Sequence, residues 1–473
     1  MTWETTIGLE VHVQLKTRSK MFCGCSTNFG DPPNTNVCPT CLALPGALPV
    51  PNAEAIRLAT LASLALNCTV HERSVFARKN YFYPDLPKGY QISQFDKPLA
   101  TKGWVEIDTA ERGRLRIGVT RLHVEEDSGK SVHDRFPGKT AIDLNRAGVP
   151  LAEIVSEPDL RSPAEARAYL VALKQILVFA GVSDCSMEEG SLRVDGNISI
   201  HRPGTPFGTK TEVKNLNSFA NVERALELEL ARQTVALDAD GRVDQVTMLY
   251  HAGSDSMRVM RSKEDSHDYR YFPDPDLPPL VLSKVWIEAR GKELPELPDQ
   301  KRHRLISAYG IPAYDAGVLT GEPVLADYFE SVVAAGAEAK QASNWVMADV
   351  IAGWNETATL QVSAPRLVAL IALVTANTIS HASARKIFAE MRTSGETPEA
   401  LADKLGLKQV ADAGVLERWV DEVLAAHPAE MARFKGGESK LIGFFVGQVM
   451  KKSGGKADPK AVQPVLMGKL TSS

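Results

Sequence analysis

Residues 121–131 read Arg121-Leu122-His123-Val124-Glu125-Glu126-Asp127-Ser128-Gly129-Lys130-Ser131, and this stretch decides the fold. Its first five residues alternate between polar and aliphatic side chains, which predicts a β-strand with one packed face and one polar face. The polar face then carries Arg121, His123 and Glu125. A carboxylate-rich strand end that runs into Gly129-Lys130 can hold a hard divalent cation, while the lysine meets the phosphates that the cation neutralises. The alternative is a solvated strand end that leads into a polar turn.

A second stretch with the same layout lies near the start of the chain. Residues 7–15 read Ile7-Gly8-Leu9-Glu10-Val11-His12-Val13-Gln14-Leu15, with the aliphatic residues on one face and Glu10 and His12 on the other. If both strands belong to one sheet, Glu10, His12, His123 and Glu125 face a common cleft as candidate metal-binding and catalytic residues. The alternative is a sheet with one wet face and no ion.

Four cysteines form two close pairs, Cys23-x-Cys25 and Cys38-Pro-Thr-Cys41. Each pair can supply two corners of a tetrahedron, so we expect a structural zinc site rather than the alternative, a set of disulfides. Four thiolate ligands leave no open position for a substrate, so this zinc would hold a loop and take no part in catalysis. Cys68 and Cys185 are interpreted as ordinary buried or loop thiols.

Further strands with polar faces follow along the chain. We expect strands at residues 143–146 and 151–155, with Glu153 as a third candidate carboxylate, and a bulge near Thr120. Residues 191–200 and 210–215 alternate in the same way and place more ions on the polar face. Of these charged residues, we expect Arg193, Asp195 and Lys210 to contact a nucleotide. The many antiparallel-style strands and few crossover helices predict an α+β fold, a mostly antiparallel sheet cradle whose floor carries the site.

A helix is predicted to begin after Ser162, because Ser162-Pro163-Ala164-Glu165 is a capping box with proline at the first helical position. Residues 78–94 are rich in aromatic and cationic side chains and in turn formers. This segment either stacks an adenine or the end of an RNA, or packs on the sheet.

Several nucleotide and hydrolase motifs are missing. Gly129-Lys130-Ser131 and Gly138-Lys139-Thr140 resemble the end of a phosphate loop, but Val124 and His133 replace the earlier glycine that the motif requires. The chain also lacks a dinucleotide-binding glycine motif, a nucleophile elbow and an amidase signature. Any nucleotide must therefore bind on the sheet through a metal and cations.

The length and composition of the chain limit the classes of protein to which it can belong. The 473 residues suggest about three domains, and 44% hydrophobic with 24% charged residues is ordinary globular composition. The N-terminus has no basic segment followed by an apolar one, and no run of about 18 apolar residues occurs, so we expect a cytoplasmic protein with no membrane association. The net charge of −4 gives no overall signature of nucleic-acid binding.

The C-terminal end is nevertheless locally basic. From Arg433 onward it has eight Lys or Arg and two acids, which indicates either a surface for a polyanion or a basic helical tail with no partner. Prolines in residues 294–298 mark a linker, and the hydrophobic period beyond it is helical. We predict a cradle domain at 1–293 with the zinc loop at 23–41, a helical linker domain at 294–362 and an α-helical tail domain at 363–473.

Seven blocks, taken together, resemble the B-subunit family of the heterotrimeric aspartyl/glutamyl-tRNA(Asn/Gln) amidotransferases. They are residues 7–13, 78–85, 121–131, 153–159, 188–193, 214–219 and 267–273. The resemblance implies a glutamine synthetase-type catalytic fold that uses ATP. The side-chain carboxylate of Asp-tRNA(Asn) and/or Glu-tRNA(Gln) would be phosphorylated, and ammonia would then displace the phosphate to give the amide.

The resemblance also implies ligands and partners. It places Mg²⁺ at Glu10, His12, Glu125 and Glu153, with Glu157 in reserve. It implies a glutaminase (the A subunit) that delivers ammonia, a small C subunit, tRNA(Asn) and/or tRNA(Gln) bound by the tail, and a non-discriminating aminoacyl-tRNA synthetase. The candidates for contacts with phosphate or with the ammonia path are Lys79, Lys88 and Lys130. Two rival hypotheses remain: a zinc-stabilised tRNA-binding scaffold whose partner does all the catalysis, and a zinc hydrolase.

Overall fold

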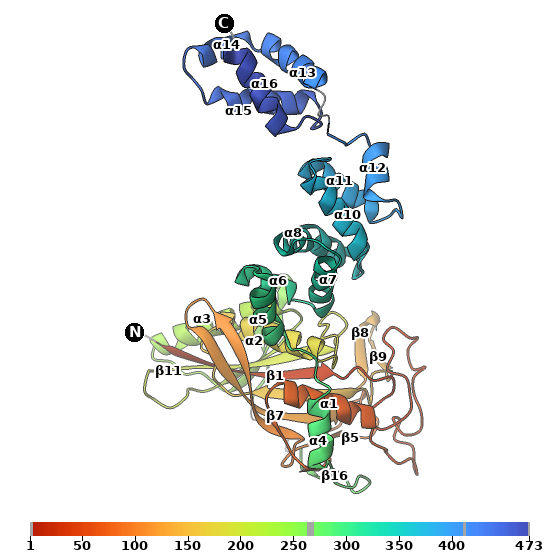
Figure 1. Ribbon diagram of the computed structural model, residues 1–473. Coiled ribbons are helices and arrows are strands. Elements are labelled where there is room, and N and C mark those ends of the chain that lie inside the picture. The colour runs from red at the N-terminus through yellow and green to blue at the C-terminus, as the bar shows by residue number, and fades with distance from the viewer. Residues whose placement is uncertain (1–2, 263–268, 410–412, 472–473) are drawn as a thin grey trace. The chain divides into compact units, whose positions relative to one another are not determined.

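The computed structural model describes residues 3–262, 269–409 and 413–471 (Figure 1). Two residues of the last quoted block, His267 and Asp268, therefore lie outside the described residues. The chain divides into two compact units, Met1–Pro298 and Asp299–Ser473. The first is built on β-sheets and the second is helical, as the sequence predicts. No helix that the described residues form is both long and apolar enough to span a lipid bilayer.

A large sheet of nine strands within the described residues forms the floor of the first unit, in the order β14-β13-β12-β11-β1-β10-β7-β6-β2. All neighbouring pairs are antiparallel except β12 and β13. The mostly antiparallel cradle is therefore confirmed. The strands are β1 (Glu4–Gln14), β2 (Thr69–Val70), β6 (Ala100–Thr109), β7 (Gly113–Glu126), β10 (Pro150–Ser156), β11 (Leu192–His201), β12 (Thr211–Leu216), β13 (Val246–His251) and β14 (Ser256–Ser262).

The aliphatic face of this sheet belongs to one hydrophobic core, to which α1 (Ala53–Ala65), α2 (Pro163–Phe179) and α3 (Phe219–Asp238) contribute. Leu122 and Val124 have no exposed surface, as the alternation predicts. Full burial of an aliphatic side chain of this size contributes about 1.5–3 kcal/mol. Burial on this side leaves the opposite faces of β1, β7 and β10 for polar residues.

Two local features that the sequence predicts are also present in the structure. Ser162 caps α2 by accepting a hydrogen bond from the Glu165 N–H, with proline at the first helical turn. The register between β10 and β7 slips by one residue, since Val155 pairs with Arg121 and Ser156 with Val119. The extra residue is Thr120, where the change in alternation predicts a bulge.

Three smaller sheets complete the first unit. One has β4 (Ala77–Asn80) between β5 (Tyr90–Ser93) and β15 (Phe272–Pro273), one pairs β3 (Arg73–Ser74) with β16 (Leu280–Val281), and one pairs β8 (Lys130–Phe136) with β9 (Lys139–Asp143). The strand expected at residues 143–146 is only the end of β9. The chain turns there because Ala147 donates to the Leu144 carbonyl and Gly148 adopts a φ of +90°, a conformation that glycine adopts readily. The unit ends with α4 (Lys284–Gly291).

The second unit contains two hydrophobic clusters. The first includes buried residues from Leu305 to Ala402 and the second from Leu416 to Leu470. Val362 and Ala364, on either side of the predicted domain boundary, both belong to the first cluster. The helices are α5 (Pro298–Tyr309), α6 (Ala313–Leu319), α7 (Pro323–Ala334), α8 (Ala339–Trp345), a π-helical turn (Val346–Val350), α9 (Ile351–Thr357), α10 (Ala364–Thr375), α11 (His381–Met391), α12 (Pro398–Lys404), α13 (Ala413–Ala426), α14 (Pro428–Lys435), α15 (Leu441–Lys452) and α16 (Pro459–Thr471).

Candidate functional site

The centre of the site is a row of side chains that crosses three strands. β10 lies between β1 and β7, and Glu153 on β10 pairs with His12 on one side and with His123 on the other. One carboxylate oxygen of Glu153 lies 3.3 Å from Nε2 of His12 and 3.3 Å from Nε2 of His123. Residues that are more than 100 positions apart in sequence thus meet because the register of the sheet aligns them.

Glu10 and Glu125 complete this acidic cluster. His12 Nε2 lies 3.8 Å from Glu10 Oε1 and 3.7 Å from Glu125 Oε1, and Glu125 Oε2 lies 3.5 Å from His123 Nε2. Ligand atoms of Glu10, His12 and Glu153 lie within 4.8 Å of one another, as do those of His123, Glu125 and Glu153. The four residues that the resemblance implied for Mg²⁺ therefore fall in two overlapping groups that share Glu153, with Glu10 in one group and Glu125 in the other.

Burial and charge oppose each other in the cluster. Burial alone would disfavour the ionised form of Glu153, but the neighbouring His123 and His12 outweigh it and lower its pKa. Burial likewise disfavours a charged His123, yet Glu153 and Glu125 raise its pKa to about 9. For Glu10, burial and then the charge of Glu153 raise the pKa. The imidazole of His123 and the carboxylate of Glu153 thus favour each other's charged forms.

The donor set fits a divalent cation. Three carboxylates supply oxygen ligands of the kind that Mg²⁺ takes, while the imidazoles would suit Mn²⁺, Fe²⁺ or Zn²⁺ equally well. Nδ1 of His123 is buried and has no hydrogen-bond partner within the described part of the chain, so this ring is not fully satisfied by the protein alone.

Lys79 and an aromatic group lie beside the cluster. Burial works against the charge of Lys79 on β4, but Glu125 and Glu153 outweigh it and raise its pKa. Its Nζ lies 5.0 Å from the centre of the Tyr269 ring. Ser93 on β5 donates a hydrogen bond to Glu125 Oε2 at 3.0 Å. The sequence analysis missed Ser93, because nothing in its local pattern separates it from any other strand serine.

The other two candidate lysines lie elsewhere. Lys88 forms an ion pair with the buried Glu126, and both line a cavity of about 190 Å³ whose wall also includes Cys23 and Cys41. Lys130 is exposed at the start of β8, opposite Asp143 of β9.

The three residues expected to contact a nucleotide occupy different surroundings. Arg193 donates to the buried Asp127 with a separation of 2.8 Å, and Asp195 forms an ion pair with Lys214. Lys210 is exposed and lines a cavity of about 340 Å³, whose wall also includes Glu10. This cavity therefore begins at the acidic cluster. Its other lining residues include Gly8, Ser156, Asn197 and Phe207.

Glu157, the reserve ligand, lies apart from the cluster. Its Oε1 accepts a hydrogen bond from Thr120 at 2.9 Å, and its backbone N–H donates to the Gly118 carbonyl. It therefore fastens the bulge in β7 and does not face the histidines.

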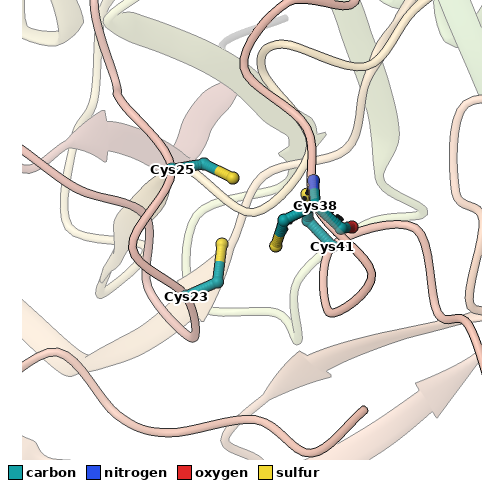
Figure 2. Close-up of side chains that lie close together, drawn as sticks. All are labelled: Cys23, Cys25, Cys38 and Cys41. Carbon is teal, nitrogen blue, oxygen red and sulfur yellow. Dashed lines mark hydrogen bonds between the residues drawn. The ribbon is translucent and has the colours of Figure 1, made fainter.

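The four cysteines of the zinc loop converge (Figure 2). Their sulfur atoms lie within 4.8 Å of one another, and Cys38 Sγ and Cys41 Sγ are 3.8 Å apart. A hydrogen bond from the Cys23 thiol lowers the pKa of Cys41 to about 4, against the effect of burial. All six cysteines of the chain are free, so the disulfide alternative is not realised. The sulfur set suits a closed tetrahedral metal site.

The fold and the site together define a class of catalytic subunit, in which an antiparallel sheet presents acids, imidazoles and cations on one face. Family models agree. The GatB/GatE catalytic domain matches residues 5–288, and the GatB domain matches residues 327–470.

Curated relatives are similar over the whole chain. The B subunit of the aspartyl/glutamyl-tRNA(Asn/Gln) amidotransferase of Geobacter sulfurreducens is 51% identical over 478 residues, and that of Moorella thermoacetica is 51% identical over 477 residues. The corresponding protein of Chlorobaculum tepidum is 50% identical over 475 residues. In each case the match covers 99% of this chain and 100% of the relative. The chain belongs to the GatB family, and the resemblance noted in the sequence is confirmed.

Proposed function

We propose that this chain is the B subunit of a tRNA-dependent amidotransferase. In the reaction, the side-chain carboxylate of Asp-tRNA(Asn) and/or Glu-tRNA(Gln) takes the γ-phosphoryl group of ATP, which leaves ADP. Ammonia then attacks the acyl phosphate, inorganic phosphate leaves, and the nitrogen loses a proton to give the amide. The observation that carries the proposal is that two overlapping groups of acids and imidazoles from three strands meet at Glu153, one with Glu10 and His12 and the other with His123 and Glu125.

The residues have distinct roles in this proposal. Glu10, Glu125, Glu153 and His12 would hold Mg²⁺, which neutralises charge on the phosphoryl group during transfer. Lys79 remains protonated beside the acids and attracts the phosphate oxygens. A carboxylate is a poor electrophile, and phosphorylation converts one of its oxygens into a leaving group.

The cavity beside Glu10 is the proposed nucleotide site. Lys210 lies on its wall and is placed to meet phosphate, while Arg193 and Asp195 lie on β11, the strand that follows β1 in the sheet. Lys88, with Glu126, lines the second cavity, and we assign this pair to the ammonia path. Lys130 is exposed, and we propose it for this reason as a further residue that contacts phosphate.

The aromatic group beside Lys79 suits the end of an RNA. The rings of Tyr271 and Phe95 are stacked with centres 4.3 Å apart, and Phe82 is 88% exposed. Bases stack on exposed aromatic side chains with little dependence on sequence. Residues 78–94 are largely packed in the sheet of β4 and β5, and we propose that the exposed Phe82, together with Phe95 and Tyr271, meets the end of the RNA.

The cysteine cluster is the proposed structural zinc site. Four thiolates would fill the coordination of the metal, which argues against a zinc hydrolase. Free cysteines throughout the chain suit the reducing cytoplasm, where we place the protein.

We infer a glutamine synthetase-type catalytic fold for the cradle, residues 1–293, because an antiparallel sheet carries the carboxylates on one face. Residues 294–362 would act as the helical linker, and residues 363–473 as the domain that binds the tRNA body. Proposed partners are the glutaminase (A) and small (C) subunits, tRNA(Asn) and/or tRNA(Gln), and a non-discriminating aminoacyl-tRNA synthetase.

The test is a Glu125→Gln variant assembled with the glutaminase and the small partner. Gln keeps the shape of the side chain but removes a charge that stabilises the transferring group. We expect ATP-dependent amide formation to fall at least about 100-fold. Glu106→Gln, which changes an acid paired with Arg114 and Arg116 on β7, is the control and should retain wild-type rates. An unchanged rate for Glu125→Gln would instead support the scaffold hypothesis.

A further inference from the structure

A wholly buried lysine lies against the cysteine cluster. Lys20 follows β1 and is 0% exposed. Its Nζ donates to the carbonyl oxygens of Asn36 at 2.7 Å and Leu144 at 3.2 Å, and it lies 3.8 Å from Sγ of Cys41. These three contacts account for the three N–H donors of an ammonium group.

Burial of a cation is costly unless a negative charge lies close to it. Two partners of Lys20 are backbone carbonyls, which are neutral. Among the three partners, only the sulfur of Cys41 can become an anion. The buried ammonium of Lys20 is therefore placed to meet negative charge at the cysteine sulfur atoms.

We propose that Lys20 is the cation that balances the charge of a zinc ion held by Cys23, Cys25, Cys38 and Cys41. This inference rests on the proposed zinc site. A Zn²⁺ ion held by four thiolates carries, together with its ligands, a net charge of −2. Lys20 reduces this local charge to −1 in surroundings from which water is excluded, where charge interactions are strong. Lys20 acts through Cys41 and is a positioning residue.

The backbone around Lys20 fits this role. The Lys20 N–H donates to the Cys25 carbonyl at 3.0 Å, and the Met21 N–H donates to the Gly148 carbonyl at 2.7 Å. A Cβ on Gly148 would lie 3.4 Å from Cδ of Lys20 and 3.8 Å from Cβ of Cys41, and its φ of +90° favours glycine. The lysine thus joins the cysteine loop to the turn at residues 144–148.

The experiment compares two variants of the full chain, Lys20→Met and Lys16→Met. Met has about the same length as Lys without the charge, and Lys16 is an exposed lysine four residues earlier. Zinc affinity is measured by competition with a chelator of known affinity. We expect Lys20→Met to bind zinc about 10- to 100-fold more weakly than wild type, and Lys16→Met to match wild type. Equal affinities for Lys20→Met and wild type would overturn the inference.

Unfolding by urea with zinc and with excess chelator separates charge balance from simple packing. We expect Lys20→Met to lose more stability relative to wild type with zinc than with excess chelator, because zinc held by four thiolates carries a larger negative charge than the cysteines without the metal. The same loss of stability in both conditions would show that Lys20 only ties the loops together, and would overturn the inference.

Two further outcomes complete the test. Should Lys20→Met fail to fold, Lys20→Gln keeps hydrogen-bond donors without the charge and should show the same weakened zinc affinity. Wild-type affinity in Lys20→Gln would count against the inference. A wild-type chain that binds neither Zn²⁺ nor Co²⁺ at the cysteines would remove the zinc site itself, an outcome that is distinct from a failure of the role of Lys20.

Discussion

At the scale of single residues, Glu153 lies at the centre of the acidic cluster, on the strand between β1 and β7. It is 4% exposed and contacts His12 and His123 from the central strand of the three. Glu125 also contacts both imidazoles, so removal of the Glu153 charge would leave Glu125 as the carboxylate that they share. The same block of sequence contains two acids, Glu153 and Glu157. The strand pairing of β10 decides which of the two joins the acidic cluster.

We therefore expect Glu153→Gln and Glu157→Gln to behave differently. Glu153→Gln should lower the rate of amide formation by at least about 100-fold, because it removes a charge next to the reacting phosphoryl group. Glu157→Gln should stay within about threefold of wild type, because its carboxylate bonds only to the bulge residue Thr120. The measurement is the ATP-dependent rate in the assembled complex. A larger loss in Glu157→Gln than in Glu153→Gln would reverse our assignment.

Residue-level prediction from the sequence succeeded where a motif carried the information. The close spacing of the cysteine pairs and the two acid-histidine alternations pointed to residues that the structure brings together. Ser93 and Lys20 could not be found in this way. Their importance comes from a neighbour that is distant in sequence, Glu125 for the serine and Cys41 for the lysine.

At the scale of elements, the strands were easier to predict than their order. Alternation depends on neighbouring residues, and it identified β1 and the second half of β7. β10 lies between them because it pairs with β7 and with β1, a strand about 140 residues earlier in the chain. The local alternation of side chains carries no information about such distant pairing. The strand expected after Asp143 failed for a related reason, since Gly148 and the hydrogen bonds of the turn override the local pattern.

An ion cluster joins α5 to α7 and gives the second unit a pH dependence. Glu330 on α7 lies 2.5 Å from Arg304 and 3.1 Å from Lys301, both on α5. The hydrogen bond from Arg304, followed by those from Lys301 and Tyr309, lowers the pKa of Glu330 to about 2. Because the folded-state pKa lies below the ordinary value of 4.5, its contribution to stability is present above about pH 4.5 and is lost as the pH falls toward 2.

We expect Glu330→Gln to lower the stability of the second unit at pH 7 by up to about 1 kcal/mol, since the group is partly exposed. The difference from wild type should shrink steadily below pH 4.5 as wild-type Glu330 takes up its proton. Urea unfolding at several pH values tests this, with Glu390→Gln, an exposed acid on α11, as the control. A difference that stays constant down to about pH 3 would contradict the role of the charge.

At the scale of the whole molecule, the two units differ in kind. The cradle carries the charged side chains of the candidate site on a sheet, whereas the second unit carries positive charge on helices near its C-terminal end. Some of these cations are paired, for example Lys469 with Asp421 and Lys452 with Glu422. Lys440 and Lys460 are exposed and are better placed to meet a polyanion. The sequence predicted the helical character and the local positive charge of this region.

If the tail binds tRNA, neutralisation of Lys440 and Lys460 should weaken binding and its salt dependence together. We expect the double variant Lys440→Ala/Lys460→Ala to bind aminoacyl-tRNA more weakly at low salt. The slope of log K against log salt should fall by roughly 0.7–0.9 for each phosphate that a lysine no longer neutralises. Titration of the assembled complex at several salt concentrations gives both values. An unchanged slope would mean that these lysines do not meet phosphate.

The central position of β1 also has a consequence for synthesis of the chain. β1 is made first, yet its two neighbours in the sheet, β10 and β11, begin only at Pro150 and Leu192. While the ribosome makes the intervening residues, the backbone N–H and C=O groups and aliphatic side chains of β1 lack the strands with which they pair in the finished sheet. Long-range pairing of this kind folds slowly and leaves strand edges open to aggregation. The backbone groups of β1 therefore stay without their partners until β10 and β11 have been made, and the acidic cluster is incomplete until the ribosome has added Glu153.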